Sequence, residues 1–261
     1  MKPLVIQSFR TSDVPPWIER CLGSVRVWAE HTGWKYRFIG DEILELVPQW
    51  YRENAGGRFP IITDLARLLV ARDALQAGSD VVVWIDADVL IFDPDSFDPS
   101  PAGTFAFARE IWIQKDTEYG QLKVFRNVHN AVCAFRRDNV FLDFYIYACE
   151  AVMRRVGGRV PDQIVGTKLL TAFNNIVGFE LLEDVGMVSP GVAREIVEGA
   201  GPALRLLCSE TRLPLRAVNL CNSLRGYDAA SVAANDALLS TVVDRLLAGG
   251  RSIFSNTDAD L

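Results

Sequence analysis

Two aspartates one residue apart follow directly after a short apolar run, Val81-Val82-Val83-Trp84-Ile85. A run of this length, rich in Val, is typical of a strand buried on both faces of an α/β sheet. Buried carboxylates are costly unless a metal or hydrogen-bond donors satisfy them, so Asp86 and Asp88 are expected at the carboxyl end of the strand, where open α/β sheets bind ligands. Two hard oxygen ligands there suit a divalent cation that carries a diphosphate. A plain Asp-rich turn is the alternative interpretation.

A charged pair in the preceding helical pattern is the second candidate. Apolar spacing predicts a helix from Ile61 to Ala77, and Asp64 and Arg67, three residues apart, lie on the same side of it. Taken alone, the pair is typical of a surface ion pair. Ahead of the two aspartates, it can instead be directed at the ligand that they hold.

A third carboxylate lies in the segment Pro161-Asp162-Gln163. This segment has the pattern of a helix start, because Pro is favoured at the first position and an acid in the first turn. Asp162 then either satisfies the helix dipole or serves as a catalytic or sugar-binding carboxylate. Both interpretations stay open.

Several other chemistries lack their motifs in this chain. The 261 residues contain two histidines and no G-x-S-x-G turn, so no Ser-His-Asp set is indicated. Neither a G-x-G-x-x-G nor a Walker-type loop is present, which leaves dinucleotide binding and P-loop phosphoryl transfer without support. Five scattered cysteines without a C-x-x-C pair indicate neither a zinc site nor a disulfide framework. The net charge of −6 argues against a nucleic-acid partner.

The elements that must position these residues follow from the apolar periodicity. A strand, a helix and a strand within the first forty residues predict a parallel βαβ unit. Residues 41–60 are expected to form short helical pieces and loop, residues 109–126 an irregular flap, and residues 190–198 a loop or short helix. Strands are expected at 4–9, 34–39, 81–85, 104–108, 128–135, 179–188, 204–208 and 216–220, and helices at 17–32, 61–77, 140–156 and 228–247. The chain is therefore predicted to be a single α/β, Rossmann-like domain over residues 1–261, with a mostly parallel central sheet flanked by helices.

The sequence also predicts a cellular location. The first residues lead into a strand and lack an apolar signal-peptide core, and no apolar stretch reaches the roughly 18 residues of a membrane span. The cysteines are most simply read as reduced core thiols. A cytoplasmic protein is therefore expected, and peripheral membrane association stays open.

A set of short motifs recurs in a recognisable order along most of the chain. They are Ile6-Gln7-Ser8 in the first strand, Trp28 in the following helix, Asp64-x-x-Arg67, Asp86-Ala87-Asp88, a strand that begins near Asn130, Pro161-Asp162-Gln163, and the segment from Asn219 to Ser223. In this order the chain resembles the DXD-containing glycosyltransferases of the GT-A fold, in particular glycosyltransferase family 32. Each motif is short, and the ordered set carries the specificity.

The resemblance implies transfer of a hexose-type sugar from a nucleotide-sugar donor, typically a UDP-sugar, to a glycan or small-molecule acceptor. It implies Mn²⁺ or Mg²⁺ as cofactor and retention of anomeric configuration. The ion would neutralise charge that grows on the diphosphate leaving group. By the same resemblance, Asp88 binds the metal and Asp86 contacts the metal or the ribose.

Further roles are carried over from the resemblance residue by residue. Gln7, Ser8, Ala87 and Asn130 would contact the donor, and Asp64 and Arg67 would hold its sugar. Asp162 or Gln163 would stabilise the oxocarbenium-like centre or orient the acceptor. Where the family has a His as a further metal ligand, this chain has Asn219, whose amide oxygen is a neutral and weaker ligand.

Two rival functions remain at this stage. A haloacid-dehalogenase-type phosphatase also places Asp-x-Asp after an apolar strand, with Asp86 as nucleophile and Asp88 as general acid, but the motif lies far from the N-terminus and no later G-D-x-x-x-D loop is evident. A sugar-nucleotide-binding protein without turnover is the other, motivated by Asn219.

Overall fold

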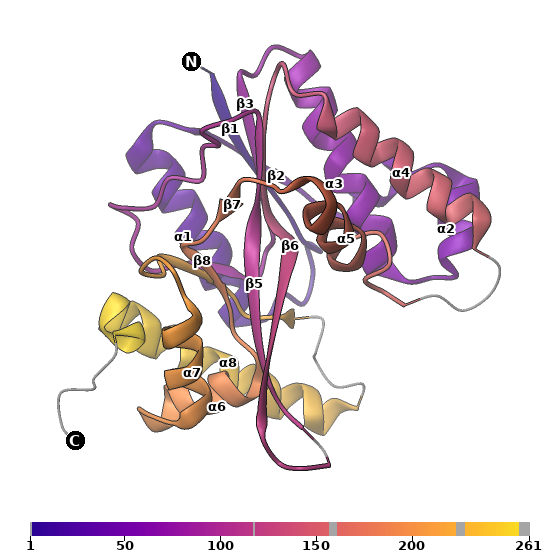
Figure 1. Cartoon of the computed structure of the whole chain (residues 1–261). Helices are drawn as coiled ribbons and strands as arrows, with labels where there is room; N and C mark the ends of the chain where they lie inside the picture. The colour runs from indigo at the N-terminus through magenta and orange to yellow at the C-terminus, as the bar shows by residue number, and fades with distance from the viewer. Residues whose placement is uncertain (1, 117, 157–160, 223–227, 256–261) are drawn as a thin grey trace.

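The computed structural model describes residues 2–116, 118–156, 161–222 and 228–255, and these build an α/β fold around a six-stranded sheet (Figure 1). The strands of this sheet, in spatial order, are β2 (Lys35–Ile39), β1 (Pro3–Ser8), β3 (Val81–Ile85), β6 (Leu122–Arg136), β5 (Phe105–Lys115) and β7 (Leu181–Leu182). The pairs β1–β2, β1–β3 and β5–β7 are parallel, whereas β3–β6 and β5–β6 are antiparallel. A second sheet joins β4 (Val89–Ile91), β9 (Ala217–Asn219) and β8 (Val185–Met187).

Helices flank the sheet on both faces, which confirms the predicted α/β class. In Figure 1, the helices α2 (Gln49–Ala55), α3 (Phe59–Gln76), α4 (Phe141–Arg155) and α5 (Thr167–Val177) lie to the right of the sheet, and α1 (Pro16–Thr32) lies to its left. The helices α6 (Pro190–Glu198), α7 (Pro202–Glu210) and α8 (Ala229–Gly249) gather at the lower end. Residues 41–60 contain the short 3₁₀ helix η1 (Asp41–Leu46) and then α2, as expected, and η3 (Gly250–Phe254) follows α8.

The strand β3 is buried on both faces, as its apolar run predicts. Val82 and Trp84 pack into the core under α3 and α4, whereas Val83 and Ile85 pack into the core under α1. Burial of each such side chain contributes about 1.5–3 kcal/mol. The sheet hydrogen bonding continues one residue past β3, where the backbone N–H of Asp86 donates to the carbonyl oxygen of Ala131 at 2.7 Å. A turn through Asp88 then leads into β4, so both aspartates lie at the carboxyl end of the strand.

The expectation of an irregular flap at residues 109–126 is wrong. These residues form most of a long antiparallel hairpin of β5 and β6, which extends below the rest of the sheet in Figure 1. Ile111 and Ile113 on β5 pack against α6–α8, and Val124 on β6 joins them. The alternation that predicts such strands is present, but interspersed charges and aromatics obscure it.

Three local expectations also need correction. Residues 204–208 are not a strand but part of α7, because Pro202 starts a helix on which Ala203, Leu204 and Leu207 are buried. The single strand expected at 179–188 is divided into β7 and β8, which belong to different sheets. The segment at Asp162 is a turn, and the helix after it begins at Thr167.

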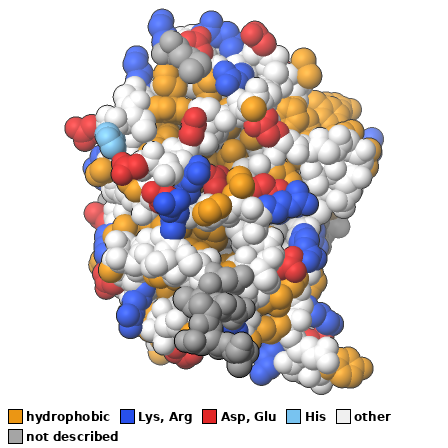
Figure 2. Space-filling model, turned by 60° about the vertical axis from the view of Figure 1, so that its left-hand side comes forward, with side chains coloured by type: hydrophobic (Ala, Val, Ile, Leu, Met, Phe, Trp, Pro, Cys, Tyr) orange, Lys and Arg blue, Asp and Glu red, His pale blue; other side chains and the backbone are white. Residues whose placement is uncertain are grey.

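The surface mixes charges of both signs. On the face shown in Figure 2, acidic and basic side chains are interspersed among polar and apolar ones, as 33 acidic and 27 basic residues in the chain lead one to expect. Within the described ranges, no helix is both long enough and apolar enough to cross a membrane.

Candidate functional site

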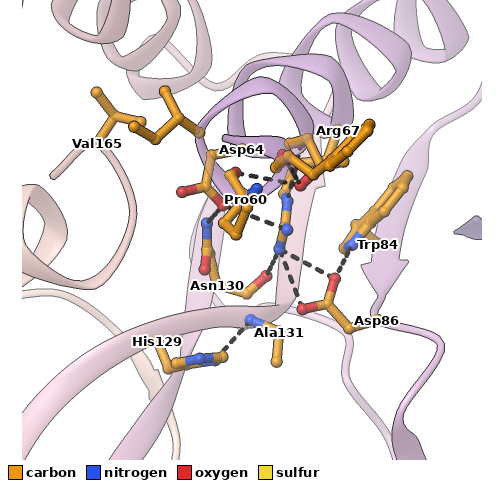
Figure 3. A network of polar contacts seen from close by, with 12 residues as sticks. Pro60, Asp64, Arg67, Trp84, Asp86, His129, Asn130, Ala131 and Val165 are labelled. Carbon is orange, nitrogen blue, oxygen red and sulfur yellow. Dashed lines mark hydrogen bonds and ion pairs between the residues drawn. The ribbon is translucent and has the colours of Figure 1, made fainter. Parts of the chain in front are cut away.

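A buried arginine connects the two candidate pairs of the sequence (Figure 3). Arg67 points from α3 toward the end of β3, and its guanidinium lies 3.2 Å from Asp64 Oδ1 and 3.0 Å from Asp86 Oδ1. It also donates to the carbonyl oxygen of Asn130 at 2.7 Å. The side chains of Arg67 and Asp64 are only 7% and 8% exposed. The pair is therefore not a surface ion pair but part of a buried network that reaches the Asp-x-Asp motif.

Aromatic packing and burial complete this network. The indole Nε1–H of Trp84 donates to Asp86 Oδ1 at 2.6 Å, and the guanidinium of Arg67 lies 5.4 Å from the Trp84 ring centroid. Burial raises the pKa of Asp64 to about 6, against the opposing effects of Arg67 and of a hydrogen bond from Asn130. Burial also raises the pKa of Asp86, again against the effect of Arg67. One cation thus serves two buried carboxylates, and this end of the pocket carries net negative charge.

Asp88 is held by hydrogen bonds from the end of β9 and the segment that follows it. Its Oδ1 accepts from the side-chain amide of Asn219 at 2.8 Å, and its Oδ2 accepts from the backbone N–H of Asn222 at 2.7 Å. Burial, and next the charge of Asp86, raise the pKa of Asp88 to about 6. Within the described residues, no Lys or Arg lies in ion-pairing distance of Asp88, so its charge is compensated only by hydrogen bonds.

These carboxylates fit a divalent cation. From the described residues, each carboxylate oxygen of Asp88 accepts one hydrogen bond, which leaves a lone pair for a metal. Mg²⁺ and Mn²⁺ commonly use one or two carboxylates and complete their coordination with water and substrate phosphates. Among the described residues, no group of three or more His, Cys, Asp or Glu side chains is arranged to hold a metal by itself.

Asn219 is oriented away from the position of a third ligand. Its amide nitrogen donates to Asp88, and its Oδ1 accepts from the backbone N–H of Cys221 at 2.7 Å. Because Cys221 N–H needs an acceptor, the amide orientation is set by its hydrogen bonds. Asn219 positions Asp88 in this arrangement, and its role as a metal ligand, which requires the amide to turn, stays a prediction.

A pocket of about 360 Å³ brings most of the predicted site residues together. The pocket is bounded by the end of β3, the first turns of α3, the bend at Asn130 in β6 and the segment after β9. The predicted residues that line it are Ser8, Asp64, Arg67, Asp86, Ala87, Asp88, Asn130, Asp162, Gln163 and Asn219. Gln7 is fully buried instead, where it donates to the backbone oxygen of Asp86 and accepts from the Tyr36 hydroxyl.

Asp162 and Gln163 lie in the turn before α5. The Asp162 side chain is 58% exposed and lies 3.6 Å from the Arg58 guanidinium, just ahead of α3. Gly166 follows, and a Cβ at this position would lie 2.6 Å from Asp64 Oδ2 and 3.3 Å from Asn130 Nδ2. Glycine is therefore required for the turn to approach the buried network.

Three residues at this site, Trp84, Asn222 and His129, carry no role that the sequence pattern predicts. Trp84 was counted only as part of an apolar strand, although its indole N–H holds Asp86. Asn222 lies in the motif segment from Asn219 to Ser223, but it holds Asp88 through its backbone N–H, a role that no residue pattern predicts. His129 also lines the pocket, and its position beside Asn130 at the start of an apolar run was the available signal.

Comparisons with known proteins give structural likenesses only. No family model matches the chain, and none of the curated proteins matches it. A glycosyltransferase involved in the glycosylation of the major capsid of PBCV-1 is similar at 12% identity and a TM-score of 0.49, over 92% of this chain and 99% of that one. Mouse xyloside xylosyltransferase 1 is similar at 10% identity and 0.43, over 85% and 98%. The glycosyltransferase GlyE of Streptococcus pneumoniae TIGR4 follows at 12% identity and 0.37, over 100% and 66%.

Proposed function

We propose that the chain is a glycosyltransferase that moves a hexose-type sugar from a nucleotide sugar, a UDP-sugar in the first instance, to a glycan or small-molecule acceptor. The observation that carries the proposal is the position of Asp86 and Asp88. They lie together at the carboxyl end of a parallel strand, in one pocket with the buried Arg67. The pKa values of Asp64, Asp86 and Asp88 are raised, and the only cation among them in the described part of the chain is Arg67, so the site would be stabilised by binding a further cation. A divalent cation bound there would in turn attract a diphosphate.

The residues of the pocket divide into roles under this proposal. Asp88, and Asp86 from its free lone pairs, would hold Mn²⁺ or Mg²⁺, which supplies charge neutralisation for a diphosphate leaving group. Arg67 keeps Asp86 ionised and fixes its orientation. Asp64 lines the pocket and its Oδ1 is held by Asn130 at 2.8 Å, so its carboxylate would accept hydrogen bonds from sugar hydroxyls.

Two further features accompany the proposal. Asp162 or Gln163 would face the reacting sugar from the opposite wall of the pocket, which both residues line. Retention of anomeric configuration is part of the proposal, and none of these roles requires a strong general base.

The test is the metal-dependent affinity for UDP of the wild type and of Asp88→Asn. The substitution keeps the shape of the side chain and removes its charge, so it should lower the Mn²⁺-dependent affinity in calorimetry by at least tenfold, about 1.4 kcal/mol. Asp244→Asn, in an exposed ion pair with Arg20, is the matched control and should bind as the wild type does. Absence of metal-dependent UDP binding in the wild type refutes the proposal.

A non-catalytic sugar-nucleotide-binding protein is the second candidate, because Asn219 gives its oxygen to Cys221 rather than to the cation site. Slow hydrolysis of a UDP-sugar that depends on Mn²⁺ favours the transferase. Binding without hydrolysis or transfer, across a panel of donors and acceptors, favours the binding protein. The phosphatase is disfavoured, because Arg67 and Trp84 already occupy the carboxylate that would attack phosphate.

A further inference from the structure

A buried carboxylate next to the pocket has no role in the proposed binding of the donor. Glu110 on β5 is 8% exposed, and its Oε1 accepts from Asn127 Nδ2 at 2.6 Å. Within the described part of the chain, its Oε2 accepts no hydrogen bond, and no Lys or Arg lies within ion-pairing distance. This oxygen can therefore accept a hydrogen bond from a ligand or from water.

The group that faces this oxygen is His129, which lines the pocket. Its Nδ1 accepts from the backbone N–H of Ala131 at 2.8 Å, as Figure 3 shows, so the proton of the neutral ring is on Nε2. Burial lowers the pKa of His129 to about 3, which keeps the ring neutral. The Nε2–H therefore acts as a donor, and its nearest acidic neighbour is Glu110.

The separation of the two groups suits one bridging oxygen. Nε2 of His129 and Oε2 of Glu110 are 4.0 Å apart, too far for a direct hydrogen bond. An oxygen about 2.9 Å from the nitrogen and about 2.7 Å from the carboxylate satisfies both at once. That oxygen must accept from Nε2–H and donate to Oε2, and a hydroxyl group does both.

The hairpin beyond this gap offers a surface for the rest of such a ligand. Trp112 and Phe125 are direct cross-strand partners, and by strand alternation they lie on the same face as Glu110 and Asn127. Phe125 is 43% exposed, and Trp112 is half-buried. Trp112 is two residues along the strand from Glu110, about 7 Å away, and aromatic rings present a flat apolar surface that packs against the C–H face of a sugar.

We propose that Glu110 and His129 form a hydroxyl-binding subsite for a saccharide acceptor, with the acceptor chain extending along Trp112 and Phe125. One sugar hydroxyl accepts from His129 Nε2–H and donates to Glu110 Oε2. The inference rests on the proposed glycosyl transfer, and it names the acceptor as a saccharide whose reacting ring enters from the side of the hairpin.

The isosteric variant Glu110→Gln tests the bridge. Asn127 continues to hold the amide oxygen, so the amide nitrogen faces His129 and an acceptor is replaced by a donor. The hydroxyl of a bound sugar then loses the carboxylate that accepts its proton and can at most accept from the neutral amide instead, which should weaken saccharide binding about tenfold. The Mn²⁺-dependent affinity for UDP should remain within about twofold, because Glu110 is outside the donor part of the pocket. Glu210→Gln is the matched control. Glu210, on α7, forms an ion pair with Arg126 at another position on the hairpin.

NMR of the histidine ring nitrogens can detect saccharide binding without turnover. The chain has only two histidines, so their signals can be told apart. In protein labelled with ¹⁵N-histidine and loaded with Mg²⁺ and UDP, a panel of methyl glycosides and disaccharides is titrated while the Nε2 signals are followed. At least one saccharide should shift the His129 signal and leave that of His31 unchanged, and Glu110→Gln should need about tenfold more of it. Trp112→Ala should weaken the disaccharides more than the methyl glycosides.

The outcomes separate this inference from the proposed function. UDP binding without any saccharide-induced shift at His129, or an equal response in Glu110→Gln, overturns the subsite and leaves the donor site intact. Shifts at His129 without metal-dependent UDP binding overturn the glycosyltransferase and leave a saccharide-binding site.

Discussion

Replacement of Arg67 by Met removes the cation that the two buried acids Asp64 and Asp86 share. The guanidinium has its nearest contacts at 3.2 Å to Asp64 and 3.0 Å to Asp86, and it donates to the Asn130 carbonyl at 2.7 Å. Met has a similar length, so the cavity is nearly filled and loss of charge is the main change. The two carboxylates lose their shared cation and keep only neutral donors, Asn130 for Asp64 and Trp84 for Asp86. The Asn130 carbonyl oxygen loses its hydrogen bond from Arg67.

The expected cost follows from this geometry. Removal of one partner from a buried ion pair costs about 3–5 kcal/mol, and the side chains left behind are only 8% and 22% exposed. We therefore expect Arg67→Met to lower the unfolding free energy by about 4 kcal/mol at pH 7. Both acids then take up protons more readily in the folded than in the unfolded state. Stability consequently rises as the pH falls, and the cost at pH 5 should be about half that at pH 7.

Urea unfolding at pH 7 and pH 5 measures both values. Arg20→Met is the matched control, because Arg20 forms an exposed ion pair with Asp244, and this change should cost less than about 1 kcal/mol at either pH. A cost below about 1 kcal/mol for Arg67→Met at pH 7, or the same cost at both pH values, refutes the view of Arg67 as the shared counter-ion of this network.

Two further predictions concern the same network. Asp64→Asn should alter the pH dependence of stability, because the pKa of Asp64 is raised to about 6 in the folded protein and lies near 3.9 in an unfolded chain. The folded wild type binds the extra proton between these values, so its unfolding free energy should rise by about 2–3 kcal/mol relative to Asp64→Asn from pH 7 to pH 4 in urea titrations; a constant difference contradicts the shift. Gly166→Ala should cost about 1–3 kcal/mol in thermal unfolding and weaken UDP-sugar binding, because its Cβ meets Asp64 at 2.6 Å. Gly191→Ala, whose nearest atom is 3.8 Å away, should be neutral, and an equal loss in both variants removes the steric argument.

Local pattern was sufficient for the fold as far as β3 and the turn that follows it. The apolar run at Val81–Ile85 can be buried only between two layers of helices, and the structure places it there. Because burial of the strand forces its following carboxylates to the sheet edge, the location of Asp86 and Asp88 followed from residue order alone. The shared face of Asp64 and Arg67 likewise follows from helical geometry.

The long hairpin and α7 could not be derived in this way. On β5, charged and aromatic side chains alternate with Ile111 and Ile113. This alternation predicts a strand only if a partner covers its apolar side, and in the folded chain α6–α8 do so. Leu204 to Cys208 is equally consistent with a strand or a helix, because a short apolar run carries no clear period. Packing of Ala203, Leu204 and Leu207 against α6 and α8 decides for the helix.

The composition of the pocket was decided partly by sequence and partly by tertiary structure. Residue types and order were enough to predict that Asp86 and Asp88 lie together at the sheet edge, and their binding of a cation stays a proposal. The partners of Asp88 lie 131 and 134 residues further along the chain, and one of them acts through its backbone. The 4.0 Å gap between His129 and Glu110 exists only because β5 and β6 pair in one register. Contacts between distant segments depend on how the core packs, and so only the folded chain determines them.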